Sequence, residues 1–271
     1  MLRKILKHDM RTMARSAVPM FIASGIISVV CCAMLYFTFS FAEEADTFWG
    51  AMLIVSSFYG MGIMAIMIMS FIVSVMTALR YYKSLFTDEG YLNMVLPVKT
   101  TDMFNAKLLS TLIWTVLSVV VAAVCCLISV FVPTILYDTE VMNSLLVGIS
   151  ELITFFFGNE QTLSLATVLS TVSVIVNAVE SVLIIVTAIT IGSVVMKKNK
   201  VFGSIIFYFV ISFIQQNIIG IFEMIIEGIL GAANENGYII ALVFNILISI
   251  AISVAMYIVN YYILNRKFNI E

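Results

Sequence analysis

The sequence lacks the residue patterns of the common enzyme active sites. Its single histidine, His8, lies far along the chain from any cluster of carboxylates. No H-E-x-x-H, no metal-binding Cys/His spacing and no G-x-S-x-G occurs. A G-x-x-x-x-G-K-[ST] phosphate loop is also absent, so we do not expect the chain to hydrolyse ATP by itself. The apolar segments hold neither paired aspartates nor a serine–histidine pair for intramembrane proteolysis. We therefore expect a protein that is not an enzyme and holds no metal or cofactor of its own.

Charged residues are scarce, and this scarcity sets the class of protein. They make up 11% of the 271 residues, whereas ordinary soluble domains carry about 25%. Hydrophobic residues make up 62%, and the mean hydropathy is +1.11. Apolar runs longer than the roughly 20 residues that cross a bilayer recur along the chain. Their pattern is helical or continuous, which excludes the alternating strands of a membrane barrel. The sequence predicts an all-α membrane protein with one transmembrane domain over residues 1–271.

Six apolar segments are expected to cross the membrane, and they lie at 17–41, 50–79, 104–132, 165–195, 201–219 and 238–264. Pro133 is expected to end the third span. The mixed segment 134–161 is expected outside the cell, partly on the membrane surface. After the fifth span, we expect a short helix over 221–230 that turns back at the outer interface, within a re-entrant segment 221–237.

Residues 1–15 are expected to form an amphipathic helix in the headgroup plane of an anionic leaflet. The following apolar run is too long for a signal peptide, and further spans come after it. Asp9 lies inside the apolar stripe of this helix, where contact with lipid is unfavourable. It either pairs with a neighbouring basic side chain or faces the protein.

The distribution of basic residues predicts the orientation. With six spans, all 14 lysines and arginines fall on the side that holds both termini, the loop 80–107 and the loop 196–200. The opposite loops carry acids and no base. The positive-inside rule therefore predicts that both termini lie in the cytoplasm.

The four cysteines form two adjacent pairs inside apolar segments, Cys31–Cys32 and Cys125–Cys126. This placement favours small buried apolar side chains over a disulfide framework or a metal site.

The longest polar interruption on the basic side runs from Arg80 to Lys107 and contains a short predicted helix. Thr87 can cap its start, and the following acids sit in the first turn, where the helix dipole favours them. Pro97 ends this helix, and Thr100 or Thr101 can cap the next one.

Within this interruption, residues 82–109 read YKSLFTDEGYLNMVLPVKTTDMFNAKLL. This run closely resembles the cytoplasmic loop between the second and third spans of permease subunits of type-2 ABC exporters from Gram-positive bacteria. The tail NRKFNIE, the N-terminal helix, the six spans and the re-entrant segment are also similar to that family along essentially the whole chain.

The resemblance implies a permease in the bacterial plasma membrane that works with a separate ATP-binding subunit, which binds the ATP and Mg²⁺, and with a second, identical or different permease. It implies no nucleic-acid partner. It also implies that the loop 80–104 carries a coupling helix seated on the ATPase, formed by Lys83, Asp88, Glu89, Gly90, Tyr91 and Leu92. The alternative is a surface loop that only caps two helices.

Polar residues inside the spans are the candidates for a cargo path. Glu180 lies about 15 residues from the inner end of its span, hence near mid-membrane, where an acid costs ~2.5–3.5 kcal/mol on insertion scales. It either contributes to the path or is a protonated or hydrogen-bonded packing residue. The other candidates are Asn177, Gln215, Gln216, Asn217 and Glu223, although the amides can instead satisfy backbone groups where the helix turns back.

Acids along such a path would suit an amphipathic peptide or a hydrophobic small molecule, in particular a cationic one. A different function is a non-transporting sensor or immunity component that binds a peptide outside and couples to the same ATPase. A secondary carrier is disfavoured because the two halves show no convincing inverted repeat.

Overall fold

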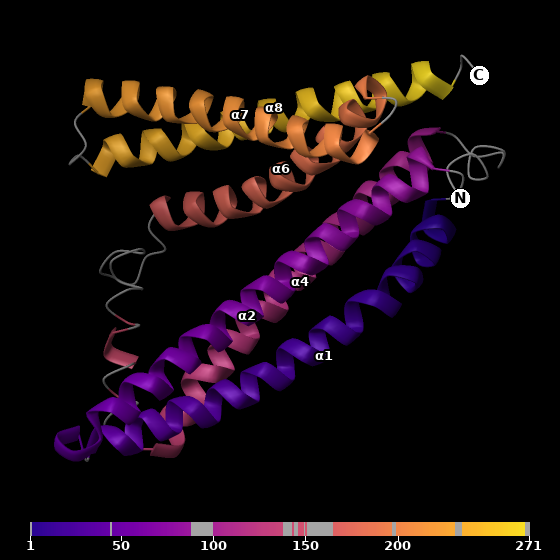
Figure 1. Ribbon diagram of the computed structural model, residues 1–271. Coiled ribbons are helices and arrows are strands. Elements are labelled where there is room, and N and C mark those ends of the chain that lie inside the picture. The colour runs from indigo at the N-terminus through magenta and orange to yellow at the C-terminus, as the bar shows by residue number, and fades with distance from the viewer. Residues whose placement is uncertain are drawn as a thin grey trace. The chain divides into compact units, whose positions relative to one another are not determined.

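The computed structural model describes most of the chain as helix (Figure 1). The described residues are 2–43, 45–87, 100–137, 143, 146–148, 150, 165–196, 199–230 and 235–268. The long helices are α1 (Leu2–Glu43), α2 (Ala45–Phe86), α4 (Thr100–Tyr137), α6 (Leu165–Val195), α7 (Lys200–Leu230) and α8 (Glu235–Phe268).

Each of these six helices is long and apolar enough to cross a membrane. The qualifying segments run from 27 to 38 residues, which exceeds the roughly 20 residues that a bilayer core requires. The prediction of a helical protein with six apolar segments long enough to cross a membrane is therefore confirmed for the described residues, and these helices suggest a multi-pass membrane protein.

The predicted surface helix 1–15 and the predicted first span form one continuous helix, α1. Pro19 lies inside it without ending it. One proline removes a single backbone hydrogen bond, and helix on both sides can hold the geometry. Ser16 turns its hydroxyl to the carbonyl oxygen of Met13 at 3.0 Å, within the same stretch of helix.

Pro133 does not end the third span, contrary to prediction, because α4 continues to Tyr137. The missing proline N–H leaves one carbonyl of the preceding turn without its helical donor. In the same turn, the Thr134 hydroxyl donates to the carbonyl oxygens of Val130 and Phe131, at 3.1 and 2.9 Å. Residues 134–137 thus belong to a helix, and most of the predicted outer segment 134–161 lies outside the described residues.

The expected break near residue 220 is also absent, since α7 runs unbroken to Leu230. Asn217 does not interrupt the helix. Its side-chain amide donates to the carbonyl oxygen of Phe213 at 2.7 Å, which is compatible with a continuous helix. Of the predicted re-entrant segment, residues 221–230 belong to α7, residues 235–237 belong to α8, and residues 231–234 lie outside the description.

The chain divides into two compact units. Unit 1 comprises Met1–Asp9, Ala78–Leu112 and Phe156–Glu271, and unit 2 comprises Met10–Thr77 and Ile113–Phe155. Unit 1 therefore holds α6, α7 and α8 together with the end of α2 and the start of α4, the two segments that flank residues 88–99. Its apolar core joins α6 and α8 to the end of α2 and the start of α4, through Tyr81, Leu85, Met103, Phe104, Val182, Val186, Ile189 and Leu264.

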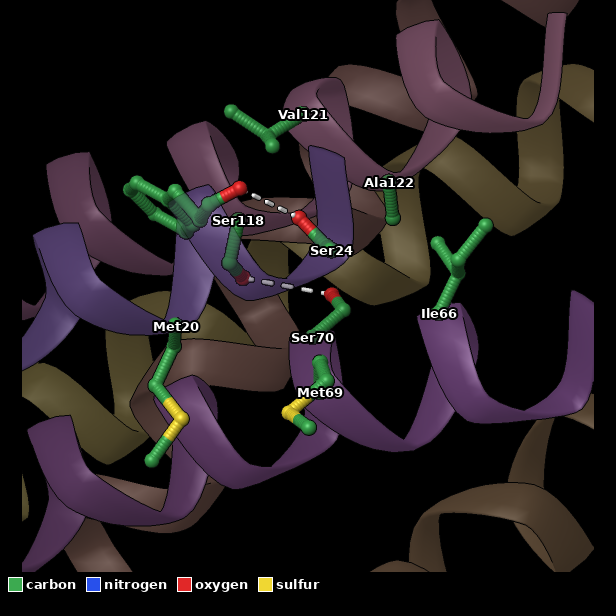
Figure 2. Close-up of a pocket in the computed structure, with 9 residues that line it drawn as sticks. Met20, Ser24, Ile66, Met69, Ser70, Ser118, Val121 and Ala122 are labelled. Atoms are coloured by element: carbon green, nitrogen blue, oxygen red, sulfur yellow. Dashed lines mark hydrogen bonds between the residues drawn. The ribbon is translucent and has the colours of Figure 1, made fainter. Parts of the chain in front are cut away.

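Unit 2 packs parts of α1, α2 and α4 through small and aromatic side chains. Trp114 stacks on Phe21, with ring centroids 6.1 Å apart. A cavity between the three helices is lined in part by serines, with Ser70 and Ser118 hydroxyls 3.5 Å apart (Figure 2). Its centre has room of about 10 Å³, enough for one water molecule at most. We do not regard it as a ligand site.

The cysteines of unit 2 are free thiols. Cys31 and Cys125 are buried, as predicted, whereas Cys32 and Cys126 are half-buried. Among the described residues, no cluster of three or more metal-binding side chains occurs.

Candidate functional site

One face of α6 carries a line of polar side chains, of which Glu180 and Thr187 are buried and Asn177 is exposed. In the most apolar stretch of α6, half of the residues are buried inside the protein. The corresponding share is 22% or less in each of the other five long helices. Asn177, Glu180 and Thr187 are spaced by three and seven residues, which puts them on one helical face. This face turns toward α8.

Two hydrogen bonds connect α6 to α8. The Ser249 hydroxyl donates to Asn177 Oδ1 at 3.2 Å, and Asn260 Nδ2 donates to Thr187 Oγ1 at 2.7 Å. From the first bond to the second, both residue numbers rise by nearly the same amount, so α6 and α8 run parallel. That direction is required if α7 is a single crossing between them. We call this interface the polar seam and define it by Asn177, Glu180 and Thr187 of α6 with Ser249, Ser253 and Asn260 of α8.

Glu180 is the one acid among the residues that define the seam, and 1% of its surface is exposed. The Ser249 hydroxyl from α8 and the Gln215 side-chain amide from α7 approach its carboxyl group. Its Oε1 atom has no hydrogen-bond partner among the described residues. The structure therefore brings together three of the predicted path residues, Asn177, Glu180 and Gln215.

Further unsatisfied atoms lie along the same seam. Ser253 Oγ and Asn260 Oδ1 are buried and have no hydrogen-bond partner within the described part of the chain. Most buried polar atoms in proteins are paired, so three such atoms at one helix interface distinguish it from ordinary packing.

The other predicted path residues lie elsewhere. Gln216 and Asn217 are exposed on α7, because successive helical residues point about 100° apart and cannot share the direction of Gln215. Glu223 is also exposed, and its Oε1 accepts a hydrogen bond from Asn245 Nδ2 at 3.1 Å. These residues form no common site with Glu180.

Sequence reasoning missed the polar residues of α8, which include the α8 side of the seam. Asn245, Ser249, Ser253 and Asn260 are polar residues in a strongly apolar span, spaced by four, four and seven. That spacing gives one helical face and could have been detected in the same way as the α6 stripe.

The helix ends that flank residues 88–99 are fixed to α6 and α8. The hydroxyls of Tyr81 and Thr190 are 3.4 Å apart, and both residues are buried. On α4, Asn105 Oδ1 accepts a hydrogen bond from the Tyr257 hydroxyl at 2.9 Å, and the Phe104 ring lies 5.5 Å from that of Tyr257.

The candidate coupling residues can be placed only in part. Lys83 is exposed in the last turn of α2. Asp88, Glu89, Gly90, Tyr91 and Leu92 lie outside the described residues. Just before them, the carbonyl oxygen of Phe86 accepts a hydrogen bond from Lys200 Nζ at 3.3 Å, which links the end of α2 to the start of α7.

Asp9 has a partner that is distant in sequence. Its carboxylate oxygens lie 2.9 and 2.8 Å from Lys107 Nζ on α4. Both residues are buried, with 3% and 7% of their surface exposed. Asp9 therefore faces the protein, which is the second of the two expectations, and its partner is not a neighbouring basic residue but Lys107 of α4.

Comparison with protein-family models, with curated proteins and with solved structures returns no match for this chain.

Proposed function

We propose that this chain is the permease subunit of an ATP-driven exporter, powered by a separate ATP-binding subunit that docks on residues 80–104. One observation supports this proposal most directly. The two helix ends that flank residues 88–99 belong to the same compact unit as the polar seam, and the Tyr81–Thr190 and Asn105–Tyr257 contacts join them to α6 and α8. A force applied to the loop would therefore reach the buried polar residues.

The proposed mechanism takes its free energy from the partner. ATP and Mg²⁺ bind to the ATPase subunit, and its closure moves the docked loop. This chain contributes two alternative packings of its helices, with different affinities for cargo. Asn177, Glu180 and Gln215 would contribute to the path. The cargo would be an amphipathic peptide or a hydrophobic small molecule.

A second permease would complete the transporter. The exposed surface of α7 supports this part of the proposal, because the amide of Gln216 is exposed there among exposed apolar side chains such as Phe213 and Ile214. Amide side chains in membrane spans are commonly satisfied by neighbouring helices.

The proposed location is the bacterial plasma membrane, with both termini in the cytoplasm. We expect an epitope tag inserted at Asn93 to react with an impermeant reagent only after cells are opened. A tag inserted at Asn234 should react in intact cells, because it precedes the last span. The reverse pattern would exclude both the orientation and docking of a cytosolic ATPase on residues 80–104.

The substitution Glu89→Lys tests the docking surface. We expect it to lower copurification of the partner ATPase at least tenfold, because it reverses a charge in the proposed contact, while membrane insertion is unchanged. Glu43→Lys makes the same charge change at the other end of the hairpin formed by the first two spans and should retain the ATPase. Equal ATPase recovery with both variants would contradict the docking role of this loop.

A further inference from the structure

We infer that Glu180 is a proton-binding site: its carboxyl group carries a proton while α6, α7 and α8 are packed together and releases it when α7 withdraws. The inference concerns this chain alone and does not depend on the ATPase partner. It starts from the enclosure of the carboxyl group, which is 1% exposed and has an oxygen without a hydrogen-bond partner among the described residues.

Among the described residues of α6, α7, α8 and the end of α2, no compensating charge lies near Glu180. It is the one charged residue in α6. On α7, the titratable residues nearest to Gln215 are Tyr208 and Glu223, each about 10–12 Å away along the helix. On α8, Tyr257 is a similar distance from Ser249, about 12 Å. On α2, Tyr81 contacts α6 at Thr190, about 15 Å from Glu180 along the helix.

An ionised carboxylate without a nearby cation is very unfavourable in a medium of low polarity. The neutral acid removes this cost.

The hydrogen bonds around the site also accommodate the neutral acid. The Ser249 hydroxyl already donates to Asn177 Oδ1, so the Ser249 oxygen remains available as an acceptor. A carboxylic acid is a donor as well as an acceptor, whereas a carboxylate only accepts. A protonated Glu180 can therefore donate its O–H to the Ser249 oxygen, while the Ser249 hydroxyl donates to Asn177 Oδ1. The Gln215 amide approaches the same carboxyl group and can act in either sense.

The close packing around Glu180, which is 1% exposed, favours a proton over a larger ligand. Neither the cavity in unit 2 nor the shallow hollow along α7 is lined by Glu180. Binding requires one new O–H bond, with the proton taken from water, and release returns the proton to water. No other reactant is involved.

Proton binding of this kind links helix packing to pH. The packed state holds one proton more than a state in which water reaches Glu180. By linkage, acidic conditions stabilise the packed arrangement, and alkaline conditions favour separation of α7.

Infrared difference spectroscopy on the purified chain in lipid nanodiscs tests the proton site. When the pH is raised, we expect the wild-type protein to lose a carbonyl band of a protonated carboxylic acid, and Glu180→Gln to lack this change. Glu223→Gln should retain it, because Glu223 is exposed and pairs with Asn245. Ser249→Ala keeps the carboxyl group and should shift the frequency of the band.

Three results would overturn the inference: the same band in wild type and Glu180→Gln, an unshifted band in Ser249→Ala, or loss of the band on adding sodium at constant pH. The last would identify a metal-cation site.

The link to packing has its own test. In a variant without the native cysteines, Gln215→Cys reports whether α7 has withdrawn. At alkaline pH, we expect a small thiol reagent to modify it faster when Glu180 is present than in combination with Glu180→Gln, and equally fast at acidic pH. The paired comparison cancels the pH dependence of the thiol itself. Equal rates at all pH values would contradict the linkage.

Discussion

The substitution Lys107→Ala is expected to lower the free energy of unfolding by about 3–5 kcal/mol. Lys107 Nζ lies 2.9 and 2.8 Å from the two carboxylate oxygens of Asp9, and both residues are almost fully buried. Removing the cation leaves a buried carboxylate without a partner, and this loss is far more costly than the ion pair is stabilising. Unfolding by denaturant in detergent micelles, followed by circular dichroism, measures the effect.

Two control variants separate the ion pair from general effects. Lys83→Ala removes an exposed lysine at the end of α2 and should change stability by less than about 0.5 kcal/mol. The double variant Asp9→Leu with Lys107→Met replaces both charges by apolar groups of similar size and should recover most of the loss. If Lys107→Ala were no more destabilising than Lys83→Ala, the pair would not be buried in the folded protein.

This pair also has a mechanical consequence. It fixes the start of α1 to α4 near the point where α4 begins, immediately after residues 88–99. Within unit 1, the N-terminal turns of α1 are therefore tied to the same helix that Asn105 connects to α8. A movement of the proposed coupling loop would be shared by α1, α4 and α8.

The substitution Gly192→Ala is expected to destabilise the protein by about 1–3 kcal/mol. A Cβ atom at this position would lie 2.4 Å from the backbone nitrogen of Ser204 and 2.6 Å from the carbonyl carbon of Gly203. Both are backbone atoms of α7, so the contact can be relieved only by moving the helices apart. Thermal unfolding in detergent detects the loss.

Gly220→Ala on α7 is the matched control, because a Cβ atom there meets nothing within 4 Å. Alanine is the better helix former, so this variant should be neutral or stabilising by about 0.5–1 kcal/mol. The difference between the two variants isolates the close approach of α6 to α7. Similar stabilities would mean that the two helices are not in contact at Gly192.

The contact between Gly192 and Gly203 also determines which residue of α7 lies opposite Glu180. Equal numbers of residues separate Gly192 from Glu180 on α6 and Gly203 from Gln215 on α7. Because α6 and α7 run antiparallel, placing Gly192 opposite Gly203 also places Glu180 opposite Gln215. Gly192→Ala should therefore also shift the infrared band of Glu180, whereas Gly220→Ala should not.

The helical class and the six spans could be predicted from the sequence because they depend on properties of single residues summed along a segment. Hydrophobicity and length identify a span wherever it lies in the fold. The structure agrees with that class and with the six apolar segments, including residues 165–195, which match α6.

Breaks within the helices were harder to predict. Pro133 and the amide-rich stretch at 215–217 are typical helix-ending signals, and α4 and α7 continue through them. Such residues are also compatible with a continuous helix. A single proline removes only one backbone hydrogen bond, and a side-chain amide such as that of Asn217 can bond to the helix backbone within the same turn, so neither signal has to end the helix.

The sequence alone determined that the chain has six helical apolar segments of membrane-spanning length, with all its basic residues on the side that holds both termini in a six-span arrangement. Only the tertiary structure decided that Asp9 pairs with Lys107, and that Gln215 rather than Gln216 approaches Glu180. The reason is geometric. The cost of a buried polar atom follows from residue type and depth, but its partner depends on how each helix is rotated and shifted against its neighbours, which side chains far apart in the sequence set together.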